Sequence, residues 1–243
     1  MLDNYYDFYD FEEYQDVISI ITKGKFGKEI INSLALPKEL DSLNFKLNIL
    51  HLETKEWEDL SANEIVFVVA DVLIEEEWIK ICQARPKFVV AIGCCIPKEI
   101  KLDGCSIYET QVEACAKTIL AIMFSVSYNF FHWEWKQMRD VLLQQEKQTK
   151  AIYIESMEVA ELAKLTLKKL ADEKIPLTKI KLAICSYFYK DGLSYNDVLD
   201  ISETLYNEMN PDIQFFCHSV IHPTFDSNYE ENNKIGLNVI VFY

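Results

Sequence analysis

Apolar residues follow two different spacings along this chain. In the first 107 residues, short apolar runs alternate with segments in which apolar residues return every three or four positions. Short apolar runs are typical of buried strands, and a spacing of three or four is typical of helices that cover a sheet. The alternation of the two therefore predicts a parallel α/β sheet. Strands are predicted at 17–21, 45–52, 65–70 and 87–93, and helices at 28–36 and 75–83, with a turn at 22–27.

The rest of the pattern predicts a long helix and then a second α/β region. The helix at 108–127 is apolar on nearly all sides, which predicts that it is buried. A more polar helix follows at 134–148, and Ser156 is the expected cap of a third helix. The last third alternates between strand and helix in an order that predicts a mixed sheet. Its strands are predicted at 180–189, 213–221 and 235–242, around one helix capped by Ser194.

These elements divide the chain into three parts. We expect an N-terminal α/β domain at residues 1–107, with an acidic and aromatic segment at its start. Residues 108–150 hold the core helix, a loop and the second helix, and residues 151–243 form a smaller C-terminal α/β domain. The core helix joins the two halves, so we expect them to pack as one body.

The charge and the cysteines exclude several classes of function. The 243 residues include 39 acidic and 24 basic side chains, and the formal charge of −15 disfavours binding to nucleic acid or anionic lipid. The seven cysteines form no CxxC pair, so we expect free thiols and no metal site. The N-terminus lacks an export signal, and the apolar run at 118–133 is shorter than a membrane span. We therefore expect a cytoplasmic protein without a transmembrane segment.

Three C-terminal motifs carry a resemblance to a known family. The run Gly192-Leu-Ser-Tyr-Asn-Asp-Val198 is similar to a turn and helix start of the tubulin/FtsZ family. Ser219-Val-Ile-His-Pro223 resembles the end of a central strand in that family, and Gly236-Leu-Asn-Val-Ile-Val241 resembles its final strand. The resemblance implies a nucleotide-type α/β domain, a long core helix and a smaller C-terminal α/β domain.

The resemblance also implies a GTP site, but the loop that should form it has changed. Asp71-Val-Leu-Ile-Glu-Glu-Glu-Trp78 holds no glycine and four carboxylates, whereas a phosphate loop needs small residues and positive charge. We therefore expect a degenerate GTP-binding loop and no bound cofactor, with GTP and magnesium disfavoured. A smaller N-terminal sheet is expected as well, because the span from Pro97 to Tyr108 is too short for the helix and strand of the family.

A weak anion site remains as an alternative in the first turn. Gly24 and Gly27 can expose backbone N–H groups, and Lys25 and Lys28, with Lys23 beside them, supply positive charge. The other reading is an ordinary turn between a strand and a helix.

The loop after the core helix is the expected subunit interface. In the family this loop reaches the nucleotide of the neighbouring subunit and orients the hydrolytic water. Here it reads Asn129-Phe-Phe-His-Trp-Glu134, in which a phenylalanine replaces the first acid. Glu134 is the one weak catalytic candidate, and it is equally explained as a favourable charge at a helix N-terminus. The expected interface residues are Asn129, His132, Trp133, Glu134 and Trp135.

These observations predict a non-catalytic protein that associates with itself or with an FtsZ-like homologue. The alternative is a weak GTP-binding or GTP-hydrolysing polymer, and a third is an α/β enzyme unrelated to this family. The aromatic start of the chain either docks on its own domain or binds a partner. Its aromatic residues are Tyr5, Tyr6, Phe8, Tyr9, Phe11 and Tyr14.

Overall fold

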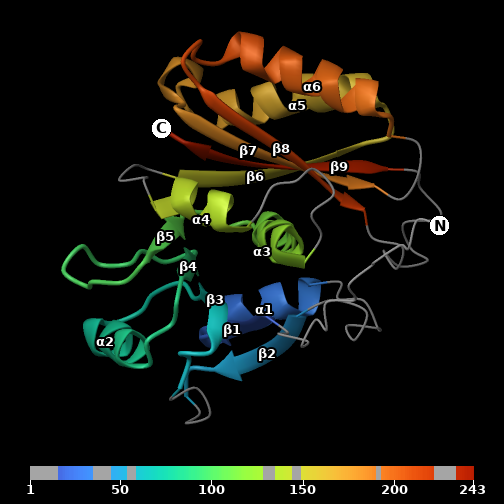
Figure 1. Cartoon of the computed structure of the whole chain (residues 1–243). Coiled ribbons are helices and arrows are strands. Elements are labelled where there is room, and N and C mark those ends of the chain that lie inside the picture. The colour runs from blue at the N-terminus through green and yellow to red at the C-terminus, as the bar shows by residue number, and fades with distance from the viewer. Residues whose placement is uncertain are drawn as a thin grey trace, which may run out of the picture.

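Two β-sheets with helices between and outside them make up the protein (Figure 1). The computed structural model describes residues 16–34, 45–53, 59–127, 135–143, 149–189, 193–221 and 234–243. Sheet A has five strands in the order β2-β1-β3-β4-β5, and sheet B has four in the order β6-β9-β7-β8. Seen as in Figure 1, the helices α3 and α4 lie between the two sheets, and α5 and α6 cover the outer face of sheet B. This is the α/β architecture with a second, mixed sheet that the sequence predicts.

Every strand pair of sheet A is parallel, as expected for strands joined by crossover helices. The predicted strands are all present, but a fifth was missed. It lies between Pro97 and Tyr108, the span expected to be too short for both a helix and a strand, and only Cys105 and Ile107 face the core there. The elements are β1 (Asp16–Thr22), α1 (Gly24–Ser33), β2 (Phe45–His51), β3 (Asn63–Val69), α2 (Glu75–Gln83), β4 (Val89–Ile92) and β5 (Gly104–Ile107).

The helix α1 begins earlier in the chain than the apolar pattern suggested. It starts at Gly24 rather than at residue 28, so the expected turn at 22–27 is mostly helical. Phe26 and Ile30, four residues apart, are both buried and place one face of the helix on the core. Gly24 provides the positive φ of 71° with which the chain leaves β1 and enters the helix.

The helix α3 (Val112–Ser127) forms the centre of the molecule. Its residues from Ala114 to Phe124 are buried, because sheet B packs on one side and α1 on the other. One hydrophobic cluster runs from the inner face of sheet A through α3 to the inner face of sheet B. The helix α4 (Trp135–Leu143) follows it and buries Met138 and Leu142 in the same cluster.

Sheet B contains one strand that the sequence did not reveal. The strand β6 pairs antiparallel with β9, as does β7, whereas β7 and β8 are parallel, which makes the sheet mixed. Ser156 ends β6 and does not cap α5: its hydroxyl accepts from the Glu158 N–H, and Glu158 is the N-cap. The elements are β6 (Thr149–Ser156), α5 (Val159–Asp172), a 3-10 turn (Leu177–Lys179), β7 (Leu182–Tyr189), α6 (Tyr195–Glu208), β8 (Gln214–Ile221) and β9 (Ile235–Phe242).

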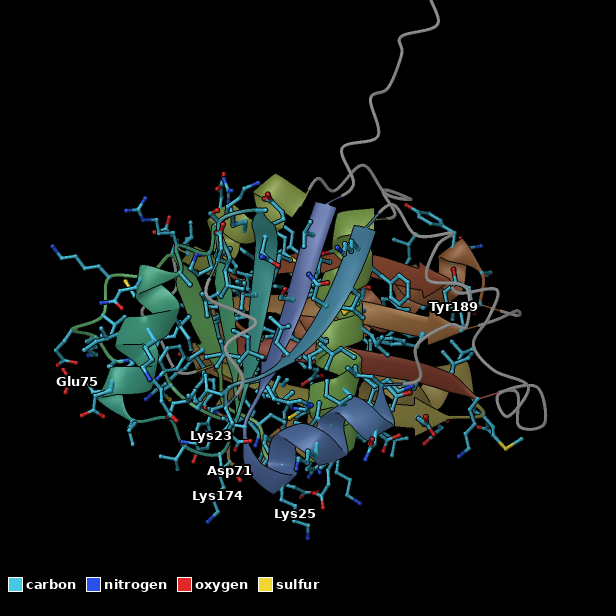
Figure 2. All side chains as sticks on the ribbon, turned by 90° about the horizontal axis from the view of Figure 1, so that it is seen from below. Lys23, Lys25, Asp71, Glu75, Lys174 and Tyr189 are labelled. Carbon is cyan, nitrogen blue, oxygen red and sulfur yellow. The ribbon has the colours of Figure 1, made fainter. Side chains whose placement is uncertain are left out.

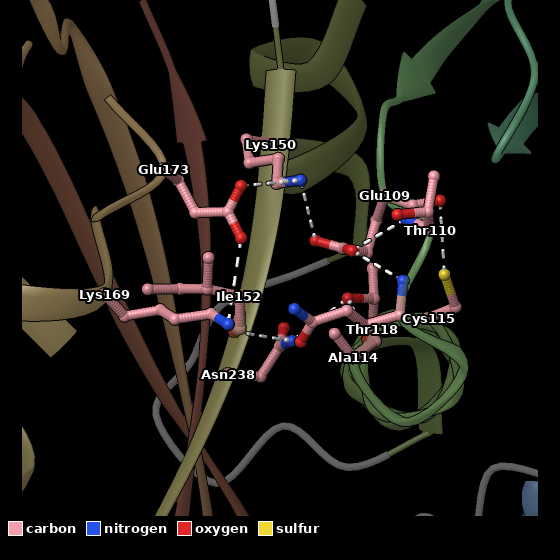
Figure 3. A network of polar contacts seen from close by, with 11 residues as sticks. Glu109, Thr110, Ala114, Cys115, Thr118, Lys150, Ile152, Lys169, Glu173 and Asn238 are labelled. Atoms are coloured by element: carbon pink, nitrogen blue, oxygen red, sulfur yellow. Dashed lines mark hydrogen bonds and ion pairs between the residues drawn. The ribbon is translucent and has the colours of Figure 1, made fainter. Parts of the chain in front are cut away.

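A polar junction ties the two sheets together where β5 ends and β6 begins. The Tyr108 N–H donates to the Thr149 carbonyl at 3.0 Å, and Tyr108 forms an isolated parallel bridge with Lys150. The amine of Lys150 lies 3.4 Å from carboxylates of both Glu109 and Glu173 (Figure 3). Glu109 is only 1% exposed, so Lys150 on β6 links a buried carboxylate just before α3 to Glu173 at the end of α5.

A second polar contact joins α3 to the centre of sheet B. Asn238, fully buried on β9, donates from Nδ2 to the Thr118 hydroxyl at 3.0 Å and to the Ile152 carbonyl at 3.3 Å (Figure 3). Because buried amides cost free energy when they lose their partners, these bonds fix how α3 lies against β6 and β9.

Candidate functional site

The carboxyl edge of sheet A is the candidate functional site. The chain moves from β1 to β2 on one side and from β3 to β4 on the other, so the strand order reverses between β1 and β3. The helices α1 and α2 accordingly lie on opposite faces of the sheet, one in the central cluster and one in a separate outer cluster. Ligands of open α/β sheets bind at such a reversal point, beyond the carboxyl ends of the strands.

Lys23 stands at the reversal point, directly after β1. Its backbone N–H donates to the Val69 carbonyl at 3.1 Å, which joins the ends of β1 and β3. Its amine lies 2.8 Å from the Glu77 carboxylate in the first turn of α2. The same carboxylate oxygen accepts from the Ile74 N–H at 2.9 Å and so caps α2. The positive charge at this point is therefore already paired inside the chain.

Phe26, in the first turn of α1, packs against Gly93, the residue after β4. Its side chain is 9% exposed. Gly93, just after β4, has a φ of 78°, and a Cβ added there would lie 2.5 Å from a ring carbon of Phe26. The same Cβ would lie 2.9 Å from the Ala70 carbonyl oxygen. An aromatic ring thus closes the backbone approach at Gly93.

The four residues of the proposed anion site share the first turns of α1 but differ in surroundings. Gly24, Lys25 and Lys28 are exposed, and no acidic residue lies in the first turn of the helix. Lys25 pairs with Glu29 at 3.4 Å on the surface. Gly27 is buried, and a Cβ there would lie 2.9 Å from both the Thr22 Cβ and the Val69 carbonyl oxygen. Close packing of α1 on the sheet explains this glycine.

The loop from β3 to α2 gives the edge its acidic character. Figure 2, seen from below, labels Asp71 beside Lys23 at the end of the strands and Glu75 further out on α2. Asp71, Glu75 and Glu76 are exposed, and the loop also exposes the apolar side chains of Val72 and Ile74. Three consecutive glutamates in the first turn suit the dipole of α2, because negative charge stabilises a helix N-terminus.

The two adjacent cysteines after β4 differ in chemistry. Burial raises the pKa of the Cys94 thiol to about 12, so at neutral pH it is protonated and not nucleophilic. Its Sγ lies 3.8 Å from the Val68 carbonyl oxygen. Cys95 is exposed, and all seven cysteines are free. Within the described ranges, no three His, Cys, Asp or Glu side chains are grouped so that they could hold a metal ion.

Most of the expected interface lies outside the described residues. Asn129, His132, Trp133 and Glu134 belong to the span 128–134, and the aromatic segment belongs to the span 1–15. Trp135 is the first residue of α4. The role of these residues stays a prediction.

Sequence reasoning missed the two features that shape this edge. The Lys23–Glu77 pair joins residues 54 positions apart, so no local pattern could reveal it. The predicted turn at 22–27 includes Phe26, although its spacing of four from Ile30 is a helical signal that begins inside this turn.

Comparison with solved structures identifies the fold. An empty FtsZ dimer from M. jannaschii matches with a TM-score of 0.58 and 8% identity over 94% of this chain and 88% of that chain. A point mutant of FtsZ from M. jannaschii matches with a TM-score of 0.57 and 9% identity, covering 94% and 91%. CetZ from Methanosaeta thermophila matches with a TM-score of 0.55 and 10% identity, covering 93% and 86%. No protein-family model and no curated protein matches the chain.

The protein is thus an α/β protein of two sheets around a central helix, with its candidate site at a strand-order reversal. Its fold is the tubulin/FtsZ-like fold, as the C-terminal motifs predicted. The fold is thus not the unrelated α/β fold of the third alternative. Each helix in the described ranges falls short of the length and apolar character that crossing a bilayer requires.

Proposed function

We propose that this protein is a non-catalytic, tubulin/FtsZ-like cytoskeletal protein with a degenerate GTP site. It acts in the cytoplasm through self-association or by binding a filament-forming homologue, in cell division or cytoskeletal organisation. One of the similar structures is described as an FtsZ dimer, which makes association between such folds the natural starting point.

The Lys23–Glu77 ion pair is the observation that carries this proposal. A triphosphate needs unpaired positive charge and open backbone N–H groups at the strand ends. Here Glu77 pairs with the Lys23 amine at 2.8 Å and also accepts from the N–H of Ile74, the N-cap residue of α2. The Phe26 ring stands over Gly93, and Asp71, Glu75 and Glu76 add negative charge around the edge. Each feature disfavours a phosphate group at the reversal point.

A second candidate function rests on the open N-terminus of α1. Gly24, Lys25 and Lys28 are exposed there, and the first turn carries no acid. A helix N-terminus with adjacent lysines attracts anions. In this alternative the protein binds GTP weakly through Gly24, Lys25, Gly27 and Lys28, and Glu134 of a neighbouring subunit assists hydrolysis.

Sedimentation velocity separates these functions and tests the interface. We expect association that does not change when GTP and magnesium are added. We expect the double variant W133A/W135A to lose it while the fold is retained. The matched control is I79A, which removes an exposed apolar side chain on α2, far along the chain from the proposed interface.

Two results would contradict the proposal. Polymers that form only with GTP favour the weak GTPase. If W133A/W135A sediments like the wild type, the loop at 128–134 and Trp135 are not part of the interface.

A further inference from the structure

The helix α6 carries an apolar stripe on an exposed side. Tyr195, Leu199 and Tyr206 are 64%, 45% and 41% exposed, although each is a large hydrophobic side chain. With Ser202, which falls between the last two, their positions are spaced by four, three and four residues. This spacing follows one side of a helix, and it is the spacing along which a second helix packs. The buried side of α6 packs on sheet B instead.

The stripe lies on the β8 side of α6 and not on the α5 side. The Tyr206 ring meets the Phe215 ring of β8 edge-on, with centroids 6.5 Å apart. The helix α5 packs over β6 and β9, on the opposite side of α6 (Figure 1). The Tyr206 hydroxyl donates to the Pro211 carbonyl at 3.1 Å, which holds this side chain in place. A partner therefore meets a surface that is already formed, which lowers the cost of binding.

Negative charge borders the stripe. The helix α6 includes the acidic residues Asp197, Asp200, Glu203 and Glu208 and no basic residue. Asp200 and Glu203 are exposed and directly follow Leu199 and Ser202 in the helix. Neither forms an ion pair with another residue in the described parts of the chain. The surface thus combines exposed apolar side chains with carboxylates that lack a counter-charge.

We infer that the α6 stripe binds a basic amphipathic helix of another protein. Apolar side chains of that helix pack along Tyr195, Leu199 and Tyr206, in the recognition mode in which a helix lays its apolar face on a hydrophobic surface. Its lysine or arginine side chains lie beside Asp200 and Glu203, where opposite charges set the orientation of the two helices and disfavour acidic competitors. The contact removes from water the apolar area that α6 exposes.

Charge disfavours the occupants that this chain itself could supply. Two copies that meet through their α6 stripes would bring acidic side chains together, which costs free energy. The two longest segments outside the described residues are acidic as well: 1–15 holds five acidic and no basic residues, and 222–233 holds three and none. The formal charge of −15 also favours a basic partner over a further acidic chain.

This inference goes beyond the proposed function, because it uses another surface and another kind of partner. The proposed function rests on the carboxyl edge of sheet A and on residues 128–135. The variant W133A/W135A should therefore bind the basic helix as the wild type does, and a failure of either idea leaves the other standing.

A synthetic peptide tests the apolar part of the inference on the full chain. The probe is a fluorescent helix of leucine and lysine, about 18 residues long, with its leucines spaced by four and three residues. We expect the wild type to bind it with a dissociation constant of about 10 µM, measured by fluorescence anisotropy. The variant Y195A/L199A should bind about tenfold more weakly. The control V72A/I79A removes two exposed apolar side chains around the acidic start of α2 and should bind like the wild type.

Two charge variants with the same net charge test the acidic part. D200N/E203Q and E75Q/E76Q each remove two exposed carboxylates, so the general attraction of a basic peptide to the acidic chain falls equally in both. We expect D200N/E203Q to bind about fivefold more weakly than E75Q/E76Q, because it alone loses the charge pairs at the stripe. A peptide of the same composition, with its leucines spread around the helix, should bind the wild type more weakly than the probe does.

Hydrogen exchange with the probe shows where it binds. Amides of α6 should gain protection while those of α2 do not, and equal urea midpoints for the stripe and control variants show that the fold is intact. The inference is wrong if the α2 variants lose as much affinity as the α6 variants, or if the wild type does not bind at about 1 mM peptide. It is also wrong if Y195A/L199A lowers self-association of the protein alone, because the stripe is then a contact between copies.

Discussion

Two glycines with positive φ stand at the carboxyl edge of sheet A, and their surroundings differ. Gly24 has a φ of 71° and nothing within 4 Å of the position that a Cβ would take. Gly93 has a φ of 78° and faces the Phe26 ring and the Ala70 carbonyl at contact distances too short for a Cβ. Only the second glycine is required by packing as well as by backbone conformation.

The pair G24A and G93A tests this difference. We expect G24A to lower the free energy of unfolding by about 1 kcal/mol, the cost of a left-handed alanine. G93A adds overpacking against Phe26 and Ala70, so its loss should be about 3 kcal/mol. Urea unfolding followed by circular dichroism measures both. Equal losses would show that the Phe26 ring does not close the backbone at Gly93.

At the scale of elements, the junction between β5 and β6 connects the candidate site to sheet B. Tyr108 follows β5 at the carboxyl edge and bonds to Thr149, and the neighbouring Glu109 is buried. Oxygen Oε1 of Glu109 accepts from the Thr110 and Gln111 N–H groups at 2.7 Å each, and its carboxylate pairs with Lys150. The start of α3 is thus held by a buried charge whose partner comes from the other sheet.

Removing Lys150 should therefore cost much more than removing the less buried Lys169, which also pairs with Glu173. K150M leaves the buried Glu109 carboxylate without a counter-charge, and we expect a loss of about 3 kcal/mol in the free energy of unfolding. The control K169M removes the more exposed pair of Lys169 with Glu173 at 3.7 Å, and should cost less than about 1 kcal/mol. Urea midpoints that fall equally in both variants would contradict a buried role for the junction.

The same network predicts a loss of stability at alkaline pH. Burial by itself would lower the pKa of Lys150, but the carboxylates of Glu109 and Glu173 outweigh burial and raise that pKa above its ordinary value of 10.5. A raised lysine pKa stabilises the fold fully below pH 10.5, and the stabilisation is lost as the pH rises through the folded value. The stability difference between wild type and K150M should therefore shrink above that pH.

Most elements could be predicted from the sequence because their apolar periodicity is local. The strand β3, the helix α2 and the Ser194 cap of α6 agree closely with the pattern. The strand β6 was missed, and its pairing with β9 joins residues about 80 positions or more apart. The same holds for the candidate site: the lysines and glycines could be named, but the Glu77 that pairs with Lys23 lies on another helix. Both the strand β6 and the Lys23–Glu77 pair depend on contacts between residues far apart in the chain, which local propensity does not reveal.

At the scale of the whole molecule, the fold is tubulin/FtsZ-like, whereas the side chains at the carboxyl edge of sheet A disfavour a phosphate group. The fold resembles FtsZ and CetZ over more than nine-tenths of the chain. The edge between β1 and β3 instead holds an internal ion pair, an aromatic ring and a row of carboxylates. A fold alone does not fix a function, so the proposed function depends on whether this edge accepts a nucleotide.

Isothermal titration calorimetry of the purified protein with GTP, GDP and ATP, each with magnesium, shows whether this edge binds a nucleotide. We expect no saturable heat at millimolar ligand. The same titration is made with the variant E77Q, which frees the Lys23 amine from its ion pair while keeping a side chain of similar shape. Saturable binding of GTP by the wild type, weakened by charge removal at Lys25 and Lys28, would contradict the account and establish the atypical nucleotide site.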